Sequence, residues 1–333
     1  MLRTALALST LTGQSVRIEN IRANRPKPGL RPQHLTAVRA AAAICRAHVT
    51  GDALGSPTLT FSPRCSAQAG RYTFDVSEAA EGGSAGSVGL VLQTVLLPLA
   101  LAEGNSHLVL RGGTHVPWAP SASYLEHVFL PFLSKVGISA RITISRWGFY
   151  PAGGGEIEVR IAGGSALTAI QGTERGALRR IWGLAVVTNL PAHIPQRMAD
   201  RAGRYLAAAD LPAQIEPRRL RGAGPGAGIF LVAEYEESRA GFTAYGRKGL
   251  PAERVAEAVC EDLLAHHQSE APFDPHLADQ AVLPLALAPG PTRVVTSRVT
   301  LHLTTNVWVV HQFLDREIGV EGEPGAAGAL YVL

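Results

Sequence analysis

Gln93-Thr-Val-Leu-Leu-Pro-Leu-Ala-Leu-Ala102 and Gln280-Ala-Val-Leu-Pro-Leu-Ala-Leu-Ala288 are nearly the same sequence at two distant places in the chain. Each reads as an apolar helix that ends in a glycine-containing turn, and a strand follows, at His107–Arg111 and at Val294–Leu303. Leu6-Ala-Leu-Ser9 belongs to a fainter third copy. A repeated unit of helix, turn and strand predicts an α/β fold of several lobes, each a sheet covered by helices.

Each repeat is followed by a further predicted helix. These helices are expected at Pro32–His48, Ser121–Val136 and Val309–Ile318. The stretch 173–267 does not follow the repeat and has strands and helices of its own, with a strand at Arg180–Asn189 as the first of them. We therefore predict a large domain of repeated lobes from residues 1–172 and 268–333, and a smaller α/β domain inserted at 173–267.

Composition sets limits on the class of protein. The chain has 333 residues, 46% of them hydrophobic and only 17% charged, which predicts a compact globular protein with apolar residues for two cores. A net charge of +4 and a pI near 9.1 suit a polyanionic partner. Three distant cysteines, Cys45, Cys65 and Cys260, argue against a disulfide framework and a zinc site, and favour a cytoplasmic protein. No apolar run reaches the length of a membrane span.

Arg22-Ala-Asn-Arg-Pro-Lys-Pro-Gly-Leu-Arg31 holds four cations and no acid. The cations are Arg22, Arg25, Lys27 and Arg31. Because Pro26 and Pro28 forbid a helix, the cations are expected on a rigid extended loop. Such a loop either grips phosphate oxygens or is a solvated basic surface, and the residues favour the two equally. Gln33 and His34 open the next helix on the same side as this loop.

Val299-Thr-Leu-His-Leu-Thr-Thr-Asn306 alternates apolar and polar residues, which predicts a half-buried strand. Its non-core face would carry Thr300, His302 and Thr304. An imidazole between two hydroxyls suits a nucleophile or a proton carrier. Taken alone, the segment favours a surface histidine, since periodicity does not report chemistry.

His276-Leu-Ala-Asp-Gln280 leads into the apolar helix of the last repeat. Asp279 and Gln280 either cap this helix or, together with Gln93 at the matching place in the earlier repeat, line a pocket between lobes. Tyr124 suits base stacking or, more commonly, core packing. The glycine-rich stretch Gly82–Ser87 could offer phosphate donors, although it matches no nucleotide-binding loop motif.

Together these stretches resemble the RNA 3'-terminal phosphate cyclase family, in family order and over nearly the whole chain. The matching pieces are Arg22–Leu30 with Gln33-His34, Gly83–Ser87 with Leu90–Thr94, Gly112–Thr114 with Pro117 and Pro120, Gly148–Gly155, Leu277–Gln280 and His302–Asn306. The resemblance implies an α/β (α+β) fold of repeated βαβαββ-type lobes, each with a four-stranded sheet and two helices, plus a small inserted α/β domain.

The resemblance also implies a chemistry. His302 would accept AMP from ATP, with Mg²⁺ or Mn²⁺, and pass it to the 3'-phosphate of an RNA, or of a DNA, before a 2',3'-cyclic phosphate forms on RNA. The nucleotide would be held by Gln93, Pro120, Tyr124, His276, Leu277, Ala278, Asp279 and Gln280. Phosphates or RNA would be held by Arg3, Arg22, Arg25, Lys27, Gln33 and His34. The resemblance assigns no metal ligand here.

Two departures from the family pattern keep alternatives open. Family members carry a glycine-rich strand and a glutamate before the Leu-Arg that matches Leu2-Arg3, and this chain starts inside that motif. A catalytically impaired RNA-binding relative is therefore one alternative, and some relatives have Tyr in place of His276. An enolpyruvyl transferase, which also uses repeated lobes, fits the motifs less well. The non-catalytic branch of the family lacks the histidine that matches His302.

Overall fold

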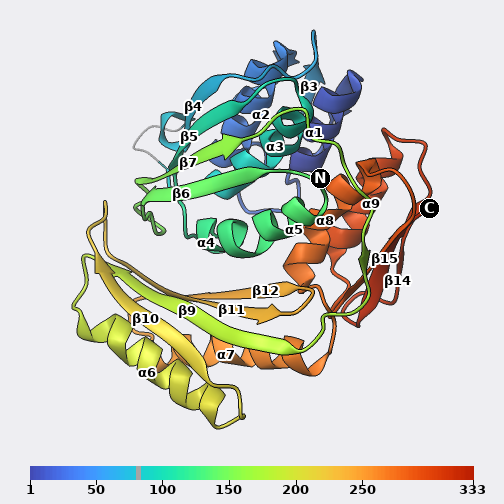
Figure 1. The fold of residues 1–333 in the computed structure, drawn as a ribbon. Coiled ribbons are helices and arrows are strands. Elements are labelled where there is room, and N and C mark those ends of the chain that lie inside the picture. The colour runs from blue at the N-terminus through green and yellow to red at the C-terminus, as the bar shows by residue number, and fades with distance from the viewer. Residues whose placement is uncertain (80–83) are drawn as a thin grey trace.

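Figure 1 shows a computed structural model of the chain, which describes residues 1–79 and 84–333. Three sheets packed with helices α1–α5, α8 and α9 form the larger part, and a fourth sheet with α6 and α7 forms the smaller part. Gly82 and Gly83 of the predicted phosphate-donating stretch lie outside the described residues. No helix of the described chain is both long and apolar enough to cross a membrane.

The first lobe begins with α1 (Leu2–Thr12), which ends at Gly13 with a left-handed φ of 74°. Its sheet has the order β1-β3-β2 and is antiparallel throughout. The other elements are β1 (Val16–Ile18), α2 (Pro32–Cys45), β2 (His48–Thr50) and β3 (Leu59–Ser62). The expectation of a four-stranded sheet in each lobe is wrong here, because only three strands pair within the described residues.

The second lobe has the sheet order β4-β5-β7-β6, in which β4 and β5 are parallel and the other pairs antiparallel. The strands are β4 (Arg71–Asp75), β5 (Ser106–Gly112), β6 (Ala140–Arg146) and β7 (Gly155–Ile161). Its helices are η1 (Val76–Ala79), α3 (Val88–Leu101), α4 (Ala122–Tyr124), the π-turn η2 (Leu125–Phe129) and α5 (Leu130–Lys135). The repeat helix α3 is apolar on every side and nearly all of it is buried, as expected for the centre of the core.

The third lobe repeats this design with α8 (Pro275–Leu287) as the central helix. Its sheet has the order β14-β15-β13-β8. The elements are β8 (Gln171–Gly172), β13 (Thr292–Thr296), α9 (Leu301–His311), β14 (Ile318–Glu321) and β15 (Gly328–Val332). The matching glutamines of the two repeats stand at matching places, one turn inside α3 and one turn inside α8.

The predicted strand through His302 is wrong, because this histidine lies in the first turn of α9. The predicted helix at Val309–Ile318 is also wrong. The observed helix, α9, spans Leu301–His311, and Ile318 is the first residue of β14. Thr300 caps α9 by accepting a hydrogen bond from the Leu303 N–H at 3.0 Å. Leu303, Val307 and Val310 are the buried positions, and their spacing is helical rather than alternating.

The smaller part is a sheet of order β10-β9-β11-β12 with its own hydrophobic core under α6 and α7. The elements are β9 (Leu178–Thr188), α6 (His193–Ala207), β10 (Ala213–Leu220), β11 (Gly226–Tyr235), β12 (Arg239–Tyr245) and α7 (Ala252–Gln268). Figure 1 shows both helices on the outer face of the sheet, so that its other face is turned toward the lobes.

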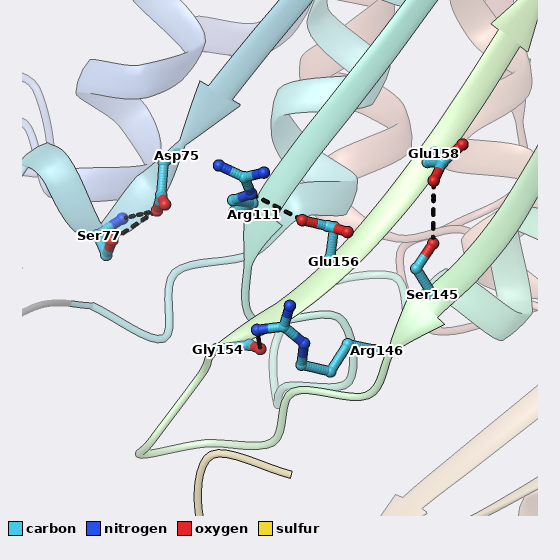
Figure 2. A network of polar contacts seen from close by, with 8 residues as sticks. All are labelled: Asp75, Ser77, Arg111, Ser145, Arg146, Gly154, Glu156 and Glu158. Carbon is cyan, nitrogen blue, oxygen red and sulfur yellow. Dashed lines mark hydrogen bonds and ion pairs between the residues drawn. The ribbon is translucent and has the colours of Figure 1, made fainter.

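Three glycine-rich turns meet where the smaller part approaches the second lobe. A Cβ on Gly153 would lie 2.9 Å from the Ala85 Cα, and one on Gly154 would lie 2.4 Å from the Ala223 Cβ. Both glycines have a φ of 65°, so they serve the turn as well as the close approach. Figure 2 shows this end of β5, β6 and β7, where Arg146 donates to the Gly154 carbonyl at 3.5 Å. The turn at Gly153-Gly154 therefore packs closely against the segments that contain Ala85 and Ala223.

His115 is a neutral buried ring at the wall of the second lobe. It stacks on Trp147, with ring centroids 3.7 Å apart, and hydrogen-bonds the hydroxyls of Thr114 at 2.8 Å and Ser123 at 2.9 Å. Burial lowers its pKa to about 3. Between that value and the usual 6.5 the unfolded chain holds a proton that the folded protein does not. Stability is therefore lost as pH falls through this window.

We expect His115→Gln to flatten this pH dependence. The slope of the unfolding free energy between pH 4 and pH 6 should fall by about 1.4 kcal/mol per pH unit, which is the contribution of one proton. Urea unfolding at several pH values measures the slope, and His193→Gln on the exposed surface of α6 serves as the comparison variant. A slope that stays at the wild-type value in His115→Gln would show that the ring takes up its proton in the folded state.

Candidate active site

Helices α1, α3 and α8 bring four predicted site residues into one hydrogen-bonded chain. The Arg3 guanidinium donates to the Gln93 Oε1 at 2.5 Å, and the Gln93 amide donates to the Gln280 Oε1. The Gln280 amide then donates to the His276 carbonyl at 2.8 Å. The two glutamines of the sequence repeat thus touch each other between lobes.

A second set of contacts joins α1, α8 and α9. The Thr300 hydroxyl donates to the Asp279 carboxylate, and the Asn306 amide donates to the Asp279 carbonyl at 3.0 Å. The Thr4 hydroxyl donates to the Asn306 Oδ1 at 2.8 Å. These buried contacts fix the start of α9 against α8, and with it the backbone that carries His302.

His302 is exposed at the N-terminal turn of α9. Its ring lies close enough to the Asp279 carboxylate to act on it electrostatically. Burial raises the pKa of Asp279, while the hydrogen bond from Thr300 and the nearby rings of His302 and His276 oppose that rise. Helix N-termini attract anions, so a phosphate that approaches His302 meets a favourable field.

The basic loop lies at the start of α2. Arg22 has a left-handed φ of 54°, and its guanidinium donates back to the Lys27 carbonyl at 2.5 Å, which closes the loop on itself. Arg25 and Lys27 are exposed. Burial and the repulsion of Arg22 and Arg31 lower the pKa of His34 to about 4, so this ring is neutral at pH 7. The segment forms no helix, as the two prolines predict, but the expected extended loop is wrong: residues 21–24 form turns, and the Arg22 contact folds the loop back.

The loop and the helix cluster belong to one region of the molecule. The amino group of Met1 lies close to Arg3, and burial and that guanidinium lower its pKa to about 5. The same amino group acts on His34. Gln33 in turn accepts a hydrogen bond from the Ser87 N–H at 2.9 Å, which joins α2 to the start of α3. A series of neighbouring charges therefore connects the two: the Met1 amino group acts on His34, Arg3 acts on that amino group, and Arg3 and His302 both act on Asp279.

Some predicted site residues take other places. Leu277 and Ala278 have their side chains in the hydrophobic core, so only their backbone could meet a ligand. Pro120 lies beside the first turn of α3, where its carbonyl would be 2.8 Å from a Cβ on Gly89. Tyr124 is buried and donates to the Asp274 carboxylate at 2.9 Å from both oxygens. Its ring meets that of His276 edge-on, with centroids 6.4 Å apart.

Four residues that organise the site carry no site prediction from the sequence. They are Thr4, Asp274, Thr300 and Asn306. Asp274 had a recognisable signal, because an aspartate directly before a proline marks a helix start. The contact between Thr4 and Asn306 joins the two ends of the chain and has no local signal.

Among the described residues the site offers little protein ligation for a metal, and the cavity inside its helix cluster is small. Within the described residues, no three His, Cys, Asp or Glu side chains are grouped as a metal site would require. The cavity enclosed by Arg3, Gln93, Asp279 and Asn306 has a volume of about 30 Å³, which suits a water-sized group. A nucleotide would therefore lie over this cluster, on the side of the exposed His302.

Comparison with known proteins is consistent with the order of the motifs. The family model described as RNA 3'-terminal phosphate cyclase matches residues 1–320. A protein of Trichormus variabilis named RNA 3'-terminal phosphate cyclase is 53% identical over 313 residues, which cover 94% of this chain and 90% of the relative. A protein of Pyrobaculum neutrophilum with the same name is 40% identical over 335 residues, covering 100% of this chain and 93% of the relative.

A protein of Methylococcus capsulatus, again with that name, is 55% identical over 314 residues, or 94% of this chain and 87% of the relative. Among solved structures, the enolpyruvyl transferase NikO from Streptomyces tendae aligns with a TM-score of 0.39 and 12% identity, over 99% of this chain and 45% of that one. That likeness is too low to support a conclusion about fold or function.

Proposed function

Because the chain belongs to the RNA 3'-terminal phosphate cyclase family, we propose that it converts the 3'-terminal phosphate of an RNA into a 2',3'-cyclic phosphate with ATP, through AMP carried on His302. The observation that supports this most is the position of His302. It is an exposed imidazole in the first turn of α9, close to the Asp279 carboxylate, and the hydrogen bond from Thr300 to Asp279 anchors the start of that helix.

In the first step a ring nitrogen of His302 attacks the α-phosphorus of ATP. A P–N bond forms, the bond to the β-phosphate oxygen breaks, and pyrophosphate leaves. The attacking ring must be neutral at the nitrogen that attacks, because a protonated nitrogen has no free electron pair. The Asp279 carboxylate lies near this ring, so it would stabilise the positive charge that the ring gains in this step.

In the second step an oxygen of the RNA 3'-phosphate attacks the phosphorus of the histidine-bound AMP. The P–N bond breaks and a phosphoanhydride forms, so the terminal phosphate now has AMP as a good leaving group. In the third step the neighbouring 2'-hydroxyl loses its proton and attacks the terminal phosphorus, which releases AMP. A DNA 3'-phosphate has no 2'-hydroxyl, so the same chemistry would stop at the anhydride.

The phosphates of ATP and of the RNA end both have to bind close to His302 in these steps. The guanidiniums of Arg3 and Arg22, with the exposed Arg25 and Lys27, offset that repulsion. Mg²⁺ or Mn²⁺ would arrive with the phosphates of ATP and screen charge there. Asp279 is the carboxylate near His302 and would be the protein group available to such an ion.

Arg25→Ala should raise the KM for ATP or for the RNA about fivefold while leaving kcat within about twofold. The side chain is exposed and forms no ion pair within the described chain, so its loss removes charge without disturbing packing. Steady-state kinetics at 50 and 300 mM salt measure the effect, which should shrink at the higher salt. A loss confined to kcat would contradict a role in binding phosphates.

Purified protein, ATP and Mg²⁺ should convert an oligoribonucleotide with a labelled 3'-phosphate into a product that phosphatase cannot strip. With α-labelled ATP alone, the protein should become labelled through an acid-labile bond. RNA binding without label on the protein and without phosphatase resistance would contradict the proposed function and favour the RNA-binding alternative.

A further inference from the structure

A cleft separates the smaller part from the second lobe, outside the site described above. Its volume is about 850 Å³, within the range of ligand-binding sites in proteins. One wall is formed by β6 and the turn after it, and the other by the face of β9 and β10 that α6 and α7 leave free. The nucleotide chemistry proposed above uses none of its lining residues.

An indole ring stands on each wall of the cleft. Trp147 follows β6 and stacks on the neutral His115 ring, so one face of the indole is covered and its orientation is fixed. Trp182 belongs to β9, and its Nε1–H donates to the Glu234 carboxylate at 2.9 Å. His127 meets the Trp182 ring edge-on, with centroids 4.8 Å apart. Two partly exposed aromatic rings held in place before any ligand arrives suit stacking on planar bases.

The charge of the cleft is weakly basic rather than strongly so. Arg180 is paired with Glu234 at 2.8 Å, and Arg218 with Glu216 at 2.7 Å. The Arg141 side chain, exposed on β6, makes neither an ion pair nor a hydrogen bond to any residue that the structure describes, and the Glu126 carboxylate of the same cleft lies close enough to act on it. A cleft with so little excess positive charge and two aromatic walls favours a ligand that is held mainly through its bases, with few phosphate contacts.

The cleft lies next to the candidate active site. Two contacts outside its lining also join the second lobe to the smaller part: the Phe149 ring packs against Gly226, and Lys135 donates to the Glu237 carbonyl at 2.5 Å. Ser123 lines the cleft, while its neighbour Tyr124 contacts the ring of His276. Adjacent residues therefore face the two places. The bases of a duplex are already stacked on each other, so only unpaired nucleotides can stack on the two indole rings.

We propose that this cleft binds unpaired nucleotides of the RNA upstream of the 3'-phosphate, with bases stacked on Trp147 and Trp182 and a phosphate near Arg141. The proposal rests on RNA being the substrate, as argued above. Because bases are held by stacking, the cleft accepts any sequence but requires a single strand, and it favours long over very short RNA ends.

Binding of RNA of two lengths tests the cleft without ATP. Fluorescence anisotropy should show that a 12-nucleotide RNA 3'-phosphate binds more tightly than a trinucleotide. Trp182→Ala and Arg141→Glu should each weaken the 12-mer about fivefold to tenfold and leave the trinucleotide unchanged. Trp182→Phe keeps an aromatic ring and should restore most of the affinity. Arg179→Glu is the matched control, because Arg179 is exposed on the same strand but alternates to its other face.

Two further outcomes decide the matter on the unaltered protein. RNA with 4-thiouridine placed several nucleotides before the 3' end should crosslink to the segments that contain Trp147 or Trp182, and crosslinks found only elsewhere would overturn the proposal. Hybridising the upstream nucleotides to a complementary strand should abolish the advantage of the 12-mer, and an unchanged advantage would overturn it too. These binding results are separate from turnover: cleft crosslinks without cyclisation would refute the proposed function alone, and normal cyclisation with length-independent binding would refute the cleft alone.

Discussion

His302→Ala should abolish labelling of the protein by α-labelled ATP and lower cyclisation at least about a thousandfold, since removal of a covalent nucleophile removes the reaction path itself. The side chain is exposed at the first turn of α9, so the variant should fold with a stability within about 0.5 kcal/mol of the wild type. Labelled ATP followed by denaturing electrophoresis measures the adduct, and urea unfolding measures the stability.

The matched control is His276→Ala, which removes the other imidazole near Asp279. Its ring lies against Tyr124 at the predicted base-binding side, so the variant should bind ATP less tightly and still form the adduct. An adduct that survives in His302→Ala, or one that disappears only in His276→Ala, would assign AMP to a different residue.

Asp274→Ala should lower the free energy of unfolding by about 3–5 kcal/mol, because one buried carboxylate joins three segments. It caps α8 by accepting from the N–H groups of His276 at 2.9 Å and Leu277 at 3.0 Å. It also accepts from the Tyr124 hydroxyl at 2.9 Å and from the Gly241 N–H in β12 at 3.3 Å. Its loss leaves all four donors without that partner in the core.

Urea unfolding of Asp274→Ala, Tyr124→Phe and the double variant separates these contributions. Tyr124→Phe removes one donor cleanly and should cost about 1–2 kcal/mol. The double variant should cost less than the sum of the single ones, because the phenol is no longer left unpaired. Strict additivity would show that the phenol and the carboxylate do not depend on each other.

The sequence repeats predicted the lobes well because burial leaves a local record. Gln93–Ala102 and Gln280–Ala288 are apolar on every side, and both are central helices of their lobes. The helix around His302 was missed because Val299–Leu303 alternates for five residues, which is long enough to imitate a strand. Two features of the same sequence indicate a helix instead: Thr300 is a suitable N-cap residue, and Leu303, Val307 and Val310 have helical spacing.

The candidate site was predictable only where its residues sit in motifs. Gln93 and Gln280 touch as their matched places suggested, and Arg22 in the loop acts on His34 in the first turn of α2. The contacts that arrange them could not be foreseen, because a hydroxyl or an amide far along the chain leaves no periodic trace. The cleft was also out of reach, since it depends on how two sheets face each other.

The hydrogen bond between Thr4 and Asn306 spans 302 positions of the chain, and the one between Gln93 and Gln280 spans 187. During synthesis the first two lobes emerge from the ribosome well before α8 and α9 exist, so they can fold while their side of the site still lacks its partner. The order of translation therefore delays the chemistry: until α9 docks, the nascent protein has the basic loop but lacks His302 at the site. Because these contacts join residues that are far apart in the sequence, forming them closes long loops, and the docking of the last helices is expected to be the slow, entropically costly step of folding.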